Sequence, residues 1–304
     1  MPRLVVLDAD NTLYDWVAFF SRPLRATLFE LHHATGLPVS TLASRFQSIF
    51  TERGTVEYSS YLDDGSLSKL PGMDPIVSAR ISMVRSERQA DSLRPYLGVR
   101  VGLKRLRALG VRIVCFSDSM RTPLLRRLHA MRVLPYIHAV YCTEDRIISH
   151  VEMDSPNVGV KTLPAGLRKP NVEALQYLLD VEQCPPDGAV ALGDNLMKDV
   201  SMAKLAGVYD CWARYGSDLS LADASLLVGV TNWSSSDVKK YFRPTPENTD
   251  IHPTLIVDSF TEFVDFIEWR WRTRPERVPV SVATAISYQE ALDFSMEDRE
   301  SIPL

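Results

Sequence analysis

The chain has 304 residues, of which 45% are hydrophobic and 24% are charged, with a formal net charge of -4. This composition is ordinary for a soluble globular protein with one large or two moderate domains. The charge gives no reason to expect a nucleic-acid or acidic-membrane partner, and no apolar run reaches the ~18 residues of a membrane span. The four cysteines are scattered without CxxC spacing, and Met1 leads directly into a strand-like run. We therefore expect a cytoplasmic protein without a signal peptide.

Short apolar runs that alternate with helical patterns predict a parallel sheet covered by helices. Helical patterns occur at about 120–133, 171–181, 198–206 and 259–270. The candidate strands are Leu4–Leu7, Val111–Phe116, Ala139–Cys142, Ala189–Leu192, Val208–Ala213 and Leu255–Val257. Such sheets bind ligands beyond the carboxyl ends of their strands. Polar residues that directly follow an apolar run are therefore the candidate site residues.

Residues 17–97 interrupt this alternation, because their apolar residues recur at helical spacing and no strand-like run separates them. We interpret them as an all-helical insertion after the first strand, placed where a lid over a site could lie. The alternative is a helical domain that only adds bulk. The stretch 143–168 is predicted to be a long loop, and 214–253 an irregular insertion rich in Ser and Pro. The tail 275–304 is predicted to be loosely ordered or packed as an appendage.

The first strand ends in two aspartates, Asp8 and Asp10, within the stretch LVVLDADNTLYDW. Two carboxylates this close repel each other and raise each other's pKa. The arrangement is tolerable if a cation sits between them, or if one acts as an acid while the other is ionised. A polar turn at the end of the strand is the alternative.

Two further strand ends carry groups that suit a phosphate. Ser117 follows Val111–Phe116 and precedes a helix, so it offers a hydroxyl beside free backbone N–H groups. A helix N-cap is the alternative role for this serine. Lys169 precedes Pro170, which we place in the first turn of the next helix. A lysine held in this way could deliver a point charge to a phosphate, although a solvated surface lysine is the alternative.

The most specific element is AVALGDNLMKDVSMAKLAG, in which a strand ends at Gly193 and Asp194. Gly193 permits a tight bend, and Asp199 in the first turn of the next helix can point back to Asp194. Asp8, Asp10 and Asp194 together would gather carboxylate oxygens for a hard cation of the Mg²⁺ kind. A metal beside a phosphate cradle implies phosphoryl transfer.

These four motifs, in this order, resemble those of the haloacid dehalogenase-like superfamily over roughly residues 3–267. The first motif of that family, DxDx(T/V), appears as Asp8-Ala9-Asp10-Asn11-Thr12. Its second and third are a Ser or Thr after a hydrophobic strand and a Lys ahead of a helix, which Ser117 and Lys169 match. The fourth, GDxxxxD, runs from Gly193 to Asp199.

The resemblance implies a Rossmann-like α/β core with an inserted helical cap of the C1 type, and a role for each matching residue. Asp8 would be the nucleophile that forms an aspartyl-phosphate, and Asp10 the general acid and base whose backbone carbonyl binds Mg²⁺. Ser117, Lys169 and the backbone of Asn11 would hold the phosphate. Asp8 and Asp194 would ligate Mg²⁺, with Asp199 supporting the metal's waters or Lys169. The second aspartate separates phosphatases and phosphomutases of this family from its dehalogenases.

The resemblance therefore implies a Mg²⁺-dependent phosphatase acting on a small phosphorylated metabolite: a nucleotide, phosphoglycolate or a sugar phosphate. A phosphomutase and a non-catalytic binding protein are the alternatives. We assign residues 1–16 and 98–267 to the core, 17–97 to the cap and 268–304 to a C-terminal extension. Lys161 is a rival for the third motif, but it lacks the Lys-Pro-helix context of Lys169. The 214–253 insertion and the extension lie outside the common core, and either could form a homodimer contact or a lid edge. Trp269 and Trp271 are candidate interface residues.

Overall fold

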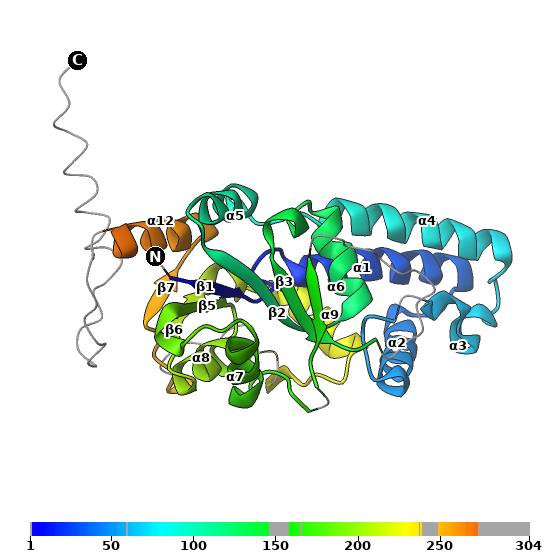
Figure 1. Cartoon of the computed structure of the whole chain (residues 1–304). Helices are drawn as coiled ribbons and strands as arrows, with labels where there is room; N and C mark the ends of the chain where they lie inside the picture. Colours follow the sequence, from blue (N-terminus) through cyan, green and yellow to red (C-terminus); the bar gives the residue numbers. More distant parts are fainter. Residues whose placement is uncertain are drawn as a thin grey trace, which may run out of the picture.

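The protein is built around a seven-stranded parallel sheet (Figure 1). The computed structural model describes residues 2–272, except for 59, 146–157, 165, 237 and 239–248. The strand order in this sheet is β4-β3-β2-β1-β5-β6-β7, and each neighbouring pair is parallel. The strands are β1 (Leu4–Leu7), β2 (Arg112–Met120), β3 (Ala139–Thr143), β4 (Gly159–Thr162), β5 (Ala189–Gly193), β6 (Tyr209–Ala213) and β7 (Leu255–Val257). The predicted α/β fold is confirmed.

Strand β1 lies in the middle of the sheet and is buried on both faces. Val5 and Leu7 belong to the hydrophobic cluster under α5, α6 and α12, whereas Leu4 and Val6 belong to the cluster under α7 and α8. The two sets of helices lie on opposite faces (Figure 1). A strand covered on both faces has a continuous apolar sequence, as LVVL does. The helices are α5 (Val99–Ala108), α6 (Arg121–Ala130), α12 (Phe260–Arg272), α7 (Val172–Val181) and α8 (Ser201–Leu205).

The segment between β1 and α5 is helical, as predicted, and projects from the sheet as a cap (Figure 1). Its helices are α1 (Trp16–Thr35), α2 (Val39–Arg53), the short α3 (Gly65–Ser68) and α4 (Pro75–Ser92). Asp15 caps α1 and Asp74 caps α4, each by accepting a backbone N–H of the first turn. The helices share a hydrophobic cluster that includes Leu31, Phe46 and Ile81. This separate cluster gives the cap its own core.

Part of the insertion at 214–253, which we expected to be irregular, is a helix, α9 (Leu221–Val230), and it packs against α1 and α2. Val230 is fully buried within the cap cluster. The Arg25 guanidinium lies 2.8 Å from Asp223 Oδ1, and Gln47 Nε2 donates to the carbonyl of Thr231 at 2.5 Å. The sequence of α9 does not show this, because its apolar side chains find their partners in a distant segment. The division into core, cap and extension stays a prediction.

Other differences from the expected elements are small. Strand β4 lies within 143–168, which we expected to be a loop. The helix predicted at 198–206 starts with a π-helical turn, η4 (Leu196–Val200). Short 3-10 turns occur at η1 (Tyr61–Asp63), η2 (Leu134–Tyr136), η3 (Pro186–Gly188) and η5 (Arg214–Gly216). The tail 275–304 lies outside the described residues. Trp269, 39% exposed, lies against Phe266, and the homodimer stays a prediction. The part of the chain that is described has no helix of the length and apolarity needed to cross a bilayer.

Candidate active site

Three buried carboxylates meet at the carboxyl ends of β1 and β5. One oxygen from each of Asp8, Asp194 and Asp199 lies within 4.8 Å of the other two. The ammonium of Lys169 joins this group, with Nζ 2.5 Å from Asp8 Oδ1 and 2.6 Å from Asp199 Oδ1. Thr12 Oγ1 donates to the other oxygen of Asp8 at 3.2 Å. Strands β1 and β5 are direct neighbours in the sheet, and this adjacency brings the first and fourth motifs together.

Asp199 reaches the cluster because the chain folds back sharply after β5. The π-helical turn η4 directs Asp199 toward the strand end, and Asp199 Oδ2 accepts the backbone N–H of Asn195 at 3.1 Å. Asn195 caps this turn through the N–H groups of Met197 and Lys198. A Cβ on Gly193 would lie 2.3–2.5 Å from the Asp199 side chain. Gly193 is therefore needed for this close approach, and not for the tight bend that the sequence suggested.

Lys169 is held both at its backbone and at its side-chain ammonium. Its backbone N–H donates to Asp118 Oδ1 at 3.0 Å, and its ammonium lies 5.0 Å from the centre of the Phe116 ring. Pro170 lies before Asn171, the N-cap of α7, and so outside the first turn where we expected it. The peptide between Lys169 and Pro170 is cis. The rival Lys161 lies on β4, with its ammonium 3.5 Å from Glu182 Oε1.

Burial changes the acidity of the cluster. Burial raises the pKa of Asp8 to about 7, against the opposing charge of Lys169. Burial also raises the pKa of Asp194 well above its ordinary value, and the nearby carboxylates of Asp8 and Asp199 add to this shift. The pKa of Lys169 is raised, because its ion pairs with Asp199 and Asp8 outweigh the effect of burial. Asp8 and Asp194 thus hold their protons more tightly than ordinary aspartates do.

The carboxylate of Asp10 has partners outside this cluster. Its Oδ2 accepts from Ser119 Oγ at 2.7 Å, and its Oδ1 accepts from the hydroxyl of Tyr14. The guanidinium of Arg127 lies 3.7 Å from Oδ1. The structure therefore groups Asp199, and not the side chain of Asp10, with Asp8 and Asp194. A metal contact of Asp10 through its backbone carbonyl stays a prediction.

Arg127 on α6 and Glu57 in the cap were not among the predicted site residues. The side chain of Arg127 is only 5% exposed, and its Nη1 lies 2.5 Å from Glu57 Oε1. Its Nη2 donates to Ser119 Oγ at 2.8 Å. The guanidinium also lies over the rings of Tyr14 and Phe19. A cap carboxylate is thus connected to Asp10 through one buried cation.

Ser117 and Asn11 lie beside the cluster, with local hydrogen bonds of their own. Ser117 is buried within β2, two positions beyond Cys115, which lines up with Leu7, and not just after the strand as expected. Its hydroxyl accepts the N–H of Ser119. It does not cap α6, whose N-cap is Met120. Asn11 has a left-handed backbone, and its side chain accepts the N–H groups of Trp16 and Val17 at the start of α1.

A model of the haloacid dehalogenase-like hydrolase family matches residues 2–207. The chain belongs to this family. Among the relatives of this haloacid dehalogenase-like hydrolase, a phosphoglycolate phosphatase of Nitrosospira multiformis is 26% identical over 216 residues, or 70% of this chain and 84% of the relative. A glyceraldehyde 3-phosphate phosphatase of Methanocaldococcus jannaschii is 23% identical over 210 residues, or 68% of this chain and 83% of the relative.

A solved structure with a similar fold is the 2-haloacid dehalogenase of Pseudomonas syringae pv. tomato. It has a TM-score of 0.51 and 15% identity, and the match covers 89% of this hydrolase and 100% of the dehalogenase. At this identity the likeness bears on the fold alone. It supports the fold described above for this hydrolase.

Proposed function

We propose that this haloacid dehalogenase-like hydrolase is a Mg²⁺-dependent phosphatase that cleaves a small phosphate monoester through an aspartyl-phosphate on Asp8. The observation that carries the proposal is the buried group of Asp8, Asp194 and Asp199 around the ammonium of Lys169. Positioning and charge neutralisation carry most of the catalysis in phosphoryl transfer. A site with a carboxylate nucleophile, a fixed ammonium and further carboxylates for a metal has the parts that this chemistry needs.

The residues present fit a magnesium ion. Asp8, Asp194 and Asp199 offer the hard oxygen ligands that Mg²⁺ prefers, and all three are buried. Lys169 pairs with Asp8 and Asp199, so the three carboxylates in their ionised form and this one ammonium would leave an excess of two negative charges, which a divalent cation would balance. The raised pKa values of Asp8 and Asp194 point the same way, because a nearby cation favours the ionised form. The bound ion would neutralise charge on the phosphate oxygens.

The proposed roles follow from where each side chain is held. Asp8 attacks phosphorus as the nucleophile, and Lys169 binds a phosphoryl oxygen. The hydroxyl of Ser117 and the backbone N–H of Asn11 complete the phosphate site. Asp10 protonates the leaving oxygen and then takes a proton from the attacking water, as a carboxylate general acid and base can. Its contacts with Ser119 and Arg127 orient the carboxylate for both steps.

The names of the two relatives support a phosphatase over a mutase, since both are called phosphatases of small phosphorylated compounds. A nucleotide, phosphoglycolate and a sugar phosphate remain the candidate substrate classes. Product analysis separates the two reactions, because a phosphatase releases inorganic phosphate and a mutase returns an isomerised sugar phosphate.

The experiment is a phosphate-release screen of the purified protein with Mg²⁺ over nucleotides, sugar phosphates and phosphoglycolate. We expect release from at least one class, loss of release with a chelator, and a phosphate adduct on the peptide that contains Asp8 after acid quenching. Asp8→Asn should lower kcat by about 10³-fold or more, as removal of a nucleophile does elsewhere. Equal rates for Asp8→Asn and wild type would refute the proposal.

A further inference from the structure

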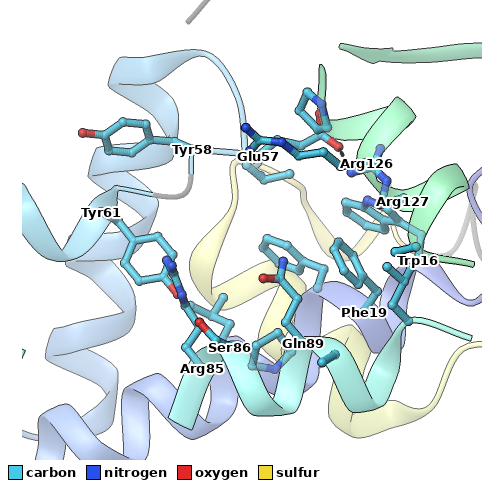
Figure 2. Close-up of a pocket in the computed structure, with 18 of the residues that line it drawn as sticks. Trp16, Phe19, Glu57, Tyr58, Tyr61, Arg85, Ser86, Gln89, Arg126 and Arg127 are labelled. Carbon is cyan, nitrogen blue, oxygen red and sulfur yellow. Dashed lines mark hydrogen bonds and ion pairs between the residues drawn. The ribbon is translucent and has the colours of Figure 1, made fainter. Parts of the chain in front are cut away.

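A cavity of about 410 Å³ lies between the cap helices α1, α2 and α4 and the core helix α6 (Figure 2). Much of its wall is aromatic. Trp16 stacks on Phe20 with ring centres 5.2 Å apart, Phe20 contacts Phe50, and Phe50 contacts Tyr61 edge-on. Phe19 and Tyr58 complete the aromatic lining. Polar residues at the exposed rim come from α4 and α6, namely Ser86, Gln89 and Arg126.

The cavity adjoins the proposed general acid. Arg127 lines the cavity, and the same guanidinium lies 3.7 Å from Asp10 Oδ1. Phe19 lines it too and contacts the ring of Tyr14, whose hydroxyl donates to Asp10. In Figure 2, Phe19 and Arg127 lie across the cavity from Tyr61 and Arg85. Arg127 and Phe19 therefore belong both to the wall of the cavity and to the surroundings of the proposed general acid. Because a general acid must face the oxygen that leaves, the organic part of a substrate would lie close to these two residues.

The size and lining of the cavity favour a flat apolar group. Its volume is within the range of roughly 300–1,000 Å³ found for pockets that hold drug-sized ligands. Glycolate or glyceraldehyde would leave most of it unfilled and would bury little of the aromatic wall. Glu57, the acid among its described lining residues, is already paired with Arg127.

We propose that this cavity binds the organic part of the substrate, and that the substrate class is a phosphate monoester of an alcohol that carries an aromatic ring system. This inference rests on the proposed phosphatase function and adds a specificity to it. Aromatic side chains bind flat rings by stacking and edge contacts, each pair worth about 0.5–1.5 kcal/mol beyond area burial. Phe20, Phe50 and Trp16 would provide these contacts.

The test uses two substrates with the same kind of leaving alcohol, ethyl phosphate and 2-(2-naphthyl)ethyl phosphate. We expect wild type to prefer the naphthyl compound by about 10–100-fold in kcat/KM, the effect of burying one large apolar group. Ser86→Trp places a bulky ring at the rim of the cavity, and we expect it to remove most of this preference. Ala79→Trp is the matched control, since Ala79 is exposed on α4 two turns away and outside the cavity. It should keep the preference.

A wild type that hydrolyses both compounds equally, or a preference that Ser86→Trp leaves intact, overturns the inference. Binding of 2-(2-naphthyl)ethanol, measured by calorimetry on wild type, Ser86→Trp and Ala79→Trp, provides a readout that needs no catalysis. If neither phosphate is hydrolysed but the alcohol binds wild type and Ala79→Trp and not Ser86→Trp, the aromatic site stands and the phosphatase proposal fails. If the alcohol does not bind wild type, the aromatic site fails whatever the activity.

Discussion

Glu57 of the cap and Arg127 of helix α6 form an ion pair of 2.5 Å, in which both side chains are largely shielded from water. The pair connects the cap to the core beside Asp10. Removal of one partner of a shielded pair leaves a charge without compensation, which costs more than the pair itself contributes.

We predict a coupling energy of about 0.5–3 kcal/mol between Glu57 and Arg127 in a double-mutant cycle. The variants are Glu57→Gln, Arg127→Met and the double variant, and the measurement is urea unfolding. Arg127→Met should also lower kcat for the accepted phosphate monoester more than it raises KM, because the Asp10 carboxylate loses a partner. If the changes in the free energy of unfolding were strictly additive and kcat were unchanged, the ion pair would contribute neither to stability nor to catalysis.

Replacement of Lys169 should separate it from its rival in the sequence. Lys169→Met leaves Asp8 and Asp199 without their common cation, and we expect it to abolish activity and to lower Tm in a chelator. Added Mg²⁺ should restore part of the lost stability, since a ligand that binds only the folded state stabilises it by about 2.7 kcal/mol at a hundred times Kd. Lys161→Met is the control, because Lys161 lies on β4 and forms an ion pair with Glu182. An active Lys169→Met enzyme would contradict the assignment.

Gly193→Ala is expected to weaken the proposed metal site, because the added Cβ would collide with the side chain of Asp199. The new Cβ would lie within 2.3–2.5 Å of Asp199 atoms, and overpacking of this kind costs about 1–3 kcal/mol. We expect a lower Tm and weaker Mg²⁺ affinity by calorimetry. The control is Gly229→Ala on α9, where a Cβ would meet nothing within 4 Å. It should leave stability unchanged or raise it by up to about 0.5 kcal/mol, since Gly229 lies in the last turn of α9, where the cost of glycine is smaller than in a helix interior. Equal behaviour of the two variants would count against the close approach.

Acid should destabilise the protein in part through Glu182. Burial acts to raise the pKa of this carboxyl, but hydrogen bonds from Arg112 and Tyr141 outweigh burial and lower it below its ordinary value. A lowered pKa in the folded state gives stability that is present above the unfolded pKa and is lost as the pH falls through the folded pKa. Unfolding of wild type and Glu182→Gln should therefore differ most near neutral pH and converge on acidification. A difference that does not depend on pH would rule out this ionisation as the cause.

The sequence contains enough information to predict the fold and the ends of the strands that precede Asp8 and Asp194, although it misses β4 and places the end of β2 too early. Leu4–Leu7 is apolar because β1 is covered on both faces, so the change to Asp8 marks the edge of the sheet unambiguously. Parallel strands place their carboxyl ends on one edge, which is why residues as distant as Asp8 and Asp194 are expected together. The structure brings these two together and adds Asp199 as the third carboxylate.

What the sequence does not reveal depends on partners that are far apart in the chain. Glu57 and Arg127 are separated by 70 residues, and each looks like an ordinary surface charge when its own segment is considered. Helix α9 lies in a Ser-rich stretch, and Val230 at its end is buried within the cap cluster, whose other members lie far away in the sequence. Local patterns carry no information on such pairs, so the cavity between cap and core emerges only in three dimensions.

Complete folding of the cap also depends on α9, a part of the chain that is synthesised much later. The contact between Gln47 and Thr231 spans 184 residues. Helices α1 and α2 are therefore synthesised well before α9, the helix that covers one side of them. Helix α9 can cover this surface only after β6 has been made, because α9 comes after β6 in the chain. Residues 17–97, grafted onto another scaffold, would carry this exposed apolar surface with them and would need α9 supplied alongside.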